Sequence, residues 1–329
     1  MLKAKDRPAL SAADGSIVYL LAIAASLTLQ FIFSLFGVSA SDPNYAAVNF
    51  VFMGCLQLGF FAVPLVCLSR RGRRLIIGFR PLKWYNYLLS VAAAGIVLGG
   101  FILLASWFEA LLTVMGYTFA DPLPFSGAAA ITLGILVTVC MAPVFEELIF
   151  RGALLSGLIQ RERVLPAVLL SGLAFSLMHI NPEQTVYQLA LGCAAGYLAL
   201  KADSLWPAVL LHAASNGIAV VFSLMPEGEP AGSLMLQNPG LFIPLSVFFA
   251  AAAAGLIHVI GRAMAGSEKR DLKGELTRRY TGDNAEALLK FRDQTNVMGQ
   301  NTHRIVYGIA LGLCAAVWLF VFILRLFFI

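Results

Sequence analysis

Residues 127–151 read GAAAITLGILVTVCMAPVFEELIFR, an apolar run that ends in two adjacent glutamates and an arginine. The run is as long as the ~20 residues that an α-helix needs to cross a bilayer. Its last part, with Glu146, Glu147 and Arg151, carries ionisable groups of a kind that membrane helices rarely contain. The stretch therefore predicts a membrane-spanning helix with a functional site in or just past its end.

Apolar stretches of similar length recur along the whole chain. The sequence is 59% hydrophobic and 12% charged, with a mean hydropathy of +0.82, whereas a soluble domain carries roughly 25% charged residues. We expect an all-α fold, a polytopic membrane bundle of about nine transmembrane segments. The expected spans are 17–39, 47–68, 86–108, 127–148, 164–180, 185–200, 205–223, 241–261 and 305–324. The fifth and sixth are short, so we expect them to be tightly packed, broken or re-entrant.

The charges of the connecting loops predict the orientation of the chain. The loops at 40–46, 109–126, 181–184 and 224–240 contain acidic residues and no Lys or Arg, whereas the alternate loops are basic. The positive-inside rule then places the N-terminus in the cytoplasm, in a protein of the plasma (inner) membrane. Arg325 departs from the pattern, and we expect it to snorkel outward from the chain end. The net charge of +5 is explained by this topology, and no folded basic domain for nucleic acid is apparent.

We expect three parts in the chain. Residues 1–126 form N-terminal transmembrane helices, 127–223 form the core that carries the candidate site, and 224–329 form C-terminal transmembrane helices with a cytoplasmic loop at 262–304. Small residues four apart suit close helix packing, either within one chain or in a dimer. These pairs are Gly95/Gly99, Gly192/Gly196 and Gly308/Gly312. They leave the oligomeric state open.

Polar groups that are costly to bury are concentrated in three of the expected spans. They are Glu146, Glu147 and Arg151 in or just past the fourth span, His179 near the end of the fifth, and His212 with Asn216 in the seventh. Each charged group costs roughly 2.5–3.5 kcal/mol to place at the centre of a membrane helix. With a rise of ~1.5 Å per residue, these groups fall ~12–24 Å from the cytoplasmic helix ends. We expect them to meet in one layer of the membrane.

The residue types in this set suit the hydrolysis of a peptide bond. Such a reaction needs an activated water, a base for its proton and donors for the oxyanion. A carboxylate in an apolar environment becomes a stronger base, so Glu146 with His179 could hold and deprotonate a water. His212 and Asn216, four residues apart on one helix face, could donate to the oxyanion. Glu147 and Arg151 have the same spacing and could form an ion pair that braces the site.

A metal site would use the same residues. Glu146, His179 and His212 would supply three ligands and leave a fourth position open, as in catalytic zinc sites. No H-E-x-x-H motif is present. Two interpretations therefore remain open, one in which no cofactor is required and one in which Zn is bound.

Each residue also has a simpler structural explanation when it is taken alone. A Glu pair at the end of a span is often only an interfacial charge, and a single membrane His is usually a packed residue. Phe175, four residues before His179, is most simply packing beside it. The presence of the complete set in three neighbouring spans favours a function.

The three motifs resemble those of a known family. E-E-x-x-x-R at 146–151, F-x-x-x-H at 175–179 and H-x-x-x-N at 212–216 occur in this order. They look like the motifs of the CAAX-protease and bacteriocin-processing (CPBP) family, also called the abortive-infection family, which includes type 2-like CAAX prenyl proteases. The resemblance covers residues 127–220 and implies a helical membrane core that opens toward the cytoplasm. It also implies that Glu146 is the water-activating base, that His179 is its partner, and that His212 and Asn216 stabilise the oxyanion.

The sequence therefore predicts an intramembrane endopeptidase, of glutamate or metallo type, that cuts at or within the cytoplasmic leaflet. Its expected partners are the lipid bilayer and a peptide or membrane-anchored protein substrate. Members of the family trim prenylated CAAX tails, or process or resist bacteriocins, and nothing in the sequence chooses among them. Two other functions stay open, a catalytically silent scaffold or bacteriocin self-immunity protein and a proton-coupled transporter. The sequence shows no inverted repeat of the kind common in transporters.

Overall fold

The computed structural model describes residues 10–36, 44–72, 75–119, 127–160, 162–225, 231–268 and 285–328. Within these ranges every regular element is a helix and no strand occurs. The expected all-α fold is confirmed.

The described residues form a series of helical segments. In chain order they are α1 (Ala12–Ser34), α2 (Tyr45–Arg71), α3 (Trp84–Val114), α4 (Gly127–Gly134), η2 (Ile135–Met141), α5 (Ala142–Glu147), η3 (Leu148–Leu155), α6 (Ser156–Leu158), α7 (Val164–Met178), η4 (Pro182–Gln184), α8 (Thr185–Ala202), α9 (Trp206–Ser223), α10 (Ala231–Gln237), α11 (Pro239–Glu268) and α13 (Ala285–Phe327). The elements η2 and η3 are π-helical, and η4 is a 3₁₀ turn.

Seven helices of the described part are long and apolar enough to cross a membrane. They contain α1, α2, α3, the continuous run Gly127–Leu158, α9, α11 and the apolar part of α13. Each of the nine expected spans falls on a helix, but α7 has only 15 residues and α8 is not among the seven. The count of nine spans and the cytoplasmic N-terminus stay predictions.

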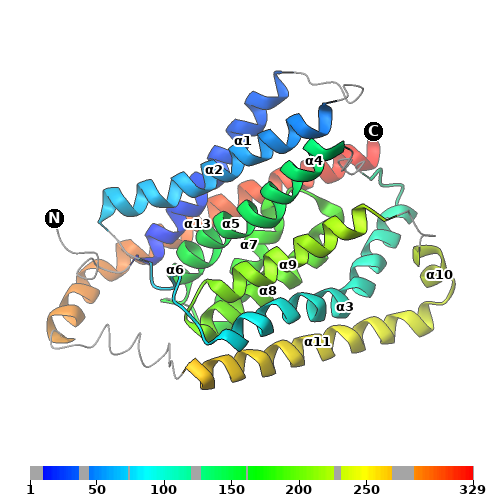
Figure 1. Ribbon diagram of the computed structural model, residues 1–329. Coiled ribbons are helices and arrows are strands. Elements are labelled where there is room, and N and C mark those ends of the chain that lie inside the picture. The colour runs from blue at the N-terminus through cyan, green and yellow to red at the C-terminus, as the bar shows by residue number, and fades with distance from the viewer. Residues whose placement is uncertain are drawn as a thin grey trace.

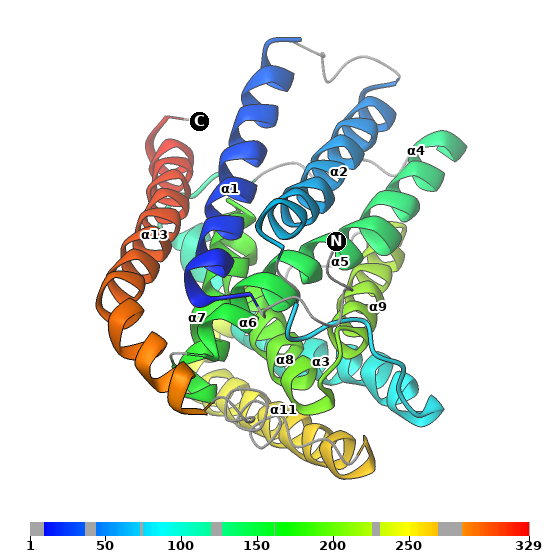
Figure 2. The same ribbon diagram turned by 90° about the vertical axis from the view of Figure 1, so that its left-hand side faces the viewer.

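The helices surround a central group. Figure 1 shows α7, α8 and α9 in the middle, α3 and α11 on one side, and α1, α2 and α13 on the other. The view turned by 90° keeps the same order (Figure 2). The most extensive contacts join α3 with α11, α7 with α8, α1 with α13 and α3 with α9. The short segment α5 packs against α2 and α9, so its glutamates lie inside the bundle.

The fourth expected span is longer than the hydropathy indicated. It was expected to end at residue 148, but the helical run continues from Gly127 to Leu158. Glu146 and Glu147 therefore lie within the helical run and not at its end. The extension from Ile149 to Leu158 is buried throughout, and its side chains are apolar except for those of Arg151 and Ser156.

The C-terminal part also differs from the expected boundaries. The loop expected at 262–304 is helical at both of its ends, because α11 continues to Glu268 and α13 begins at Ala285. Residues 269–284 lie outside the described part, so the loop between these helices stays a prediction. Arg325 lies 3.6 Å from Glu183 and donates to the carbonyl of Thr118, so its charge is paired at the end of α13.

The close packing of α7 on α8 depends on glycine. A Cβ on Gly192 would lie 3.0 Å from Gly172 Cα and 3.1 Å from its carbonyl oxygen. Gly192 thus serves packing within the chain, which is one of the two possibilities that the spacing left open. A Cβ on Gly95 or Gly99 would meet nothing within 4 Å.

We predict that Gly192→Val separates α7 from α8 and lowers the free energy of unfolding by about 1–3 kcal/mol, as overpacking does. Gly99→Val is the matched control and should change it by less than about 0.5 kcal/mol, because its surroundings are open. Thermal unfolding of the purified proteins in detergent measures both. Equal effects of the two substitutions would contradict the packing described.

Candidate active site

The two glutamates lie on a short α-helical segment between two wider π-helical stretches. Pro143 lies in the first turn of α5, where its missing N–H can be tolerated. Just before it, in η2, the amide of Ala142 bonds to the carbonyl of Val137, five residues back. A π turn of this kind shifts the side chains that follow it around the helix axis, and such turns are frequent at functional sites. Glu146 and Glu147 are only 6% and 0% exposed.

Arg151 neutralises Glu147 and ties three helical segments together. Its guanidinium is wholly buried and donates to Glu147 Oε1 over 2.7 Å and to the carbonyl of Gly192 over 2.7 Å. Glu147 Oε1 also lies 3.0 Å from His212 Nδ1. The ion pair predicted from the i,i+4 spacing is present. It links α5 and η3 to α8 and, through Glu147, to α9.

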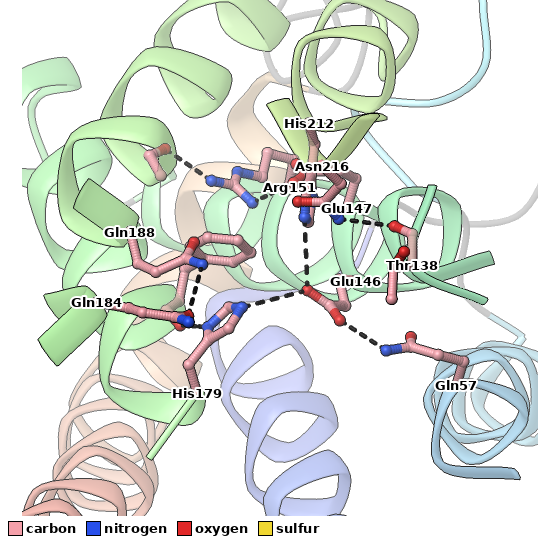
Figure 3. A network of polar contacts seen from close by, with 12 residues as sticks. Gln57, Thr138, Glu146, Glu147, Arg151, His179, Gln184, Gln188, His212 and Asn216 are labelled. Carbon is pink, nitrogen blue, oxygen red and sulfur yellow. Dashed lines mark hydrogen bonds and ion pairs between the residues drawn. The ribbon is translucent and has the colours of Figure 1, made fainter. Parts of the chain in front are cut away.

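Glu146 faces a different set of groups from Glu147. Its Oε2 lies 3.9 Å from His179 Nε2 and 4.0 Å from His212 Nε2. Its Oε1 accepts a 2.7 Å hydrogen bond from Gln57 Nε2 (Figure 3). Among the described residues Oε2 has no hydrogen-bond partner. One oxygen is thus held and the other is free between two imidazoles.

The partners of the two histidines define their neutral tautomers. His179 Nδ1 lies 2.8 Å from the carbonyl of Phe175, and His212 Nδ1 lies 3.0 Å from the Glu147 carboxylate. Both partners can only accept, so each Nδ1 carries the hydrogen. In the neutral forms both Nε2 atoms are therefore acceptors directed toward Glu146 Oε2. Three acceptors converge, and a hydrogen-bond donor or a cation fits between them.

Phe175 does more than fill space beside His179. Its ring lies 4.8 Å from the His179 ring and 5.4 Å from the His212 ring, edge to face in both cases. The guanidinium carbon of Arg151 lies 4.7 Å from its centroid, within the range of a cation–π contact. The ring therefore limits how both imidazoles can turn.

The backbone after His179 leaves the helix abruptly. α7 ends at Met178, and Ile180 adopts a left-handed conformation with φ of +52°. This conformation is unusual for a β-branched residue and concentrates strain beside functional groups. It directs the chain into η4 and α8 immediately after His179.

Asn216 is anchored to the first π-helical stretch. Its Nδ2 donates to the carbonyl of Thr138 over 2.7 Å, and it lies one turn after His212 on α9. This bond uses one of the two amide hydrogens. The second hydrogen is left for another acceptor.

The spacing of the three candidate metal ligands fits zinc poorly. A tetrahedral zinc ion bound at ~2.0–2.1 Å holds neighbouring donors about 3.3–3.4 Å apart, whereas Glu146 Oε2 lies 3.9 and 4.0 Å from the two Nε2 atoms. A water that forms two hydrogen bonds of ~2.8 Å at roughly 90–110° spans about 4.0–4.6 Å. Within the described residues no group of three or more His, Cys, Asp or Glu has the spacing to hold a metal ion.

Two contacts of the site were not predicted from the sequence. Gln57 on α2 holds Glu146, and the carbonyl of Thr138 holds Asn216. Gln57 was overlooked because it carries no charge, although an amide within an apolar span is itself a signal. The Thr138 contact depends on backbone geometry that side-chain patterns do not report.

Comparisons with known proteins agree with the geometry. Residues 128–218 match the profile of the family described as type II CAAX prenyl endopeptidase Rce1-like. A protein of Bacillus subtilis (strain 168) named "Putative membrane peptidase YdiL" is 26% identical over 118 residues, which cover 35% of this chain and 48% of that protein. The match thus spans about half the length of that relative. No solved structure matches.

The resemblance inferred from the three motifs is confirmed for this region. The matched residues include all seven motif positions, from Glu146 to Asn216, and exclude Gln57. Together with the seven apolar helices, the match identifies an integral, multi-pass membrane protein.

We predict that Arg151→Ala destabilises the fold by about 3–5 kcal/mol, because it leaves the buried Glu147 carboxylate without its cation. Thermal unfolding and the yield of membrane-inserted protein measure this effect. Arg325→Ala serves as control, since its ion pair at the end of α13 is partly exposed and should contribute at most about 1 kcal/mol. An Arg151→Ala protein as stable as the wild type would refute the bracing role.

Proposed function

We propose that the chain is an intramembrane endopeptidase in which Glu146 activates a water for attack on a peptide bond. The observation that carries this proposal is the free Glu146 Oε2, which lies between the Nε2 atoms of His179 and His212. A nucleophilic water held at this oxygen would lie beside a base and within reach of both imidazoles.

The buried cluster contains two carboxylates and one guanidinium. Glu146 and Glu147 carry two negative charges and Arg151 one positive charge, so the cluster has a net charge of −1 when both histidines are neutral. A buried uncompensated charge is costly. A role of His212 toward the oxyanion requires a hydrogen at Nε2, because Glu147 already accepts from its Nδ1. His212 Nε2 would then become a donor directed into the site.

The reaction follows from these assignments. The water oxygen bonds to the scissile carbonyl carbon, and its proton passes to Glu146 Oε2. The resulting oxyanion accepts hydrogen bonds from His212 Nε2 and from the second amide hydrogen of Asn216. The C–N bond then breaks, and Glu146 returns the proton to the departing nitrogen. His179, whose Nε2 is an acceptor, orients the water toward the substrate.

We also propose that a water, and not a zinc ion, occupies the space between Glu146, His179 and His212. The separations of 3.9 and 4.0 Å support this choice, because they exceed those of a tetrahedral zinc site. The mechanism then requires no cofactor, and the protein's own groups carry every proton transfer.

The length of α7 supports cleavage at membrane depth. Its 15 residues rise ~22 Å, less than the ~30 Å thickness of the hydrocarbon core. If α7 begins at the cytoplasmic surface, as the positive-inside rule indicates, His179 and η4 lie within the membrane. We propose that the substrate is a peptide or a membrane-anchored protein that reaches the site from the cytoplasmic side. A helix rise of ~22 Å in a core of ~30 Å places His179 beyond the midplane if α7 is upright, deeper than the cytoplasmic leaflet expected from the sequence.

We predict that Glu146→Gln lowers the rate of peptide hydrolysis by at least about 10²–10⁴-fold, because an amide cannot take the proton of the water. Cleavage of a peptide library by protein in proteoliposomes measures this. Glu109→Gln, at an exposed position on α3, should retain full activity. Both variants should unfold at the wild-type temperature. Undiminished cleavage by Glu146→Gln would refute the mechanism. An absence of cleavage by the wild type as well would favour a scaffold or transporter.

A strong chelator should leave hydrolysis by the wild-type protein unchanged, since no step uses a metal. The measurement is the initial rate before and after chelation, followed by addition of zinc. Activity that is lost on chelation and restored by zinc would assign Glu146, His179 and His212 to ligand roles.

A further inference from the structure

Gln57 is a polar residue of the site that lies outside the region matched to the peptidase family. It belongs to α2, and its side chain is 8% exposed. Most of α2 is apolar. A buried amide is unfavourable unless its N–H groups and its carbonyl form hydrogen bonds. Gln57 therefore requires hydrogen-bond partners at this position of the helix.

The amide nitrogen of Gln57 has such a partner. Nε2 donates to Glu146 Oε1 over 2.7 Å. Figure 3 shows Gln57 approaching Glu146 from the side opposite His179. The bond fixes the carboxylate so that Oε2 faces the two histidines. Gln57 thereby decides which oxygen of Glu146 acts as the base.

The amide oxygen of Gln57, in contrast, has no hydrogen-bond partner among the described residues. Oε1 is buried and accepts no hydrogen bond from the described residues. Asn49 lies about two turns before Gln57 on α2. It shows the ordinary arrangement, because its amide nitrogen donates to the carbonyl of Tyr45 in its own helix. The Gln57 side chain instead leaves its helix, and its acceptor ends unused beside Glu146.

A peptide substrate would supply hydrogen-bond donors that match this unused acceptor. Its backbone N–H groups lose their water when the chain enters a site at membrane depth, and each requires an acceptor there. We propose that Gln57 bridges base and substrate, with its N–H holding Glu146 and its carbonyl accepting one backbone N–H of the peptide. This inference rests on the proposed peptidase activity and adds a substrate contact from α2. Seating of the peptide would thus be coupled to the orientation of Glu146.

The test is a double-mutant cycle that combines a substitution in the protein with an amide-to-ester substitution in the peptide backbone. The substrate is a short quenched-fluorescent peptide that the wild-type protein cleaves, chosen from a library. Each peptide bond except the scissile one is replaced in turn by an ester, which removes a single N–H. The proteins are wild type, Gln57→Met, which keeps the length of the side chain and removes both hydrogen bonds, and Asn49→Met as the control on the same helix.

We expect Gln57→Met to lower kcat/KM by about 10- to 100-fold. One ester position should lower it by about 10-fold in the wild type and in Asn49→Met, and should have no further effect in Gln57→Met. Asn49→Met alone should cleave the all-amide peptide at the wild-type rate. Full activity of Gln57→Met would overturn the bridge. It would also be overturned if the fold-losses in kcat/KM from Gln57→Met and from the ester multiplied when the two changes were combined.

Two controls keep the outcomes separate. Glu146→Gln is assayed in parallel, so that cleavage independent of Glu146 counts against the proposed function, whereas cleavage dependent on Glu146 but not on Gln57 counts against the bridge alone. If Gln57→Met fails to fold, the ester scan of the wild-type protein still decides. The absence of any single sensitive position would overturn the proposal.

Discussion

The buried ion pair between Arg151 and Glu147 is the interaction on which the rest of the site depends. The guanidinium donates to Oε1 of the carboxylate and also to the carbonyl of Gly192, at the point where α8 packs closely on α7. Glu147 in turn holds Nδ1 of His212 on α9. Lipid offers no hydrogen bonds to these groups, so partners within the protein stabilise them. One buried cation thereby fixes the relative positions of helices that carry the histidines.

Two adjacent glutamates receive opposite roles from their surroundings. Glu147 Oε1 is engaged by a guanidinium and an imidazole, whereas its Oε2, like Glu146 Oε2, has no hydrogen-bond partner among the described residues. Glu146 is held on one oxygen by a neutral amide and keeps the other free toward two imidazoles. The first arrangement suits a structural anion and the second a base. The π-helical stretches on either side of α5 set the direction in which each carboxylate points.

Much of the fold could be predicted from hydropathy and residue spacing. The nine apolar stretches fall on helices, and the ion pair of Glu147 with Arg151 was predicted from its spacing. The helical run beyond residue 148 was not predicted, because Glu146, Glu147 and Arg151 lower the local hydropathy although the bundle buries them. The π-helical stretches and the contact of Gln57 could not be predicted, since both depend on how distant helices pack. A neutral amide also escapes a search for ionisable groups.

The central claim is that Glu146 Oε2 and the Nε2 atoms of His179 and His212 hold the nucleophilic water. A crystal structure of the purified protein, with diffraction data collected on both sides of the zinc absorption edge, tests it most directly. The account predicts a water-sized peak within hydrogen-bonding distance of Glu146 Oε2, ~2.6–3.2 Å, with no anomalous signal. An anomalous zinc peak bonded to these three side chains, or a Glu146 carboxylate turned away from both imidazoles, would contradict it.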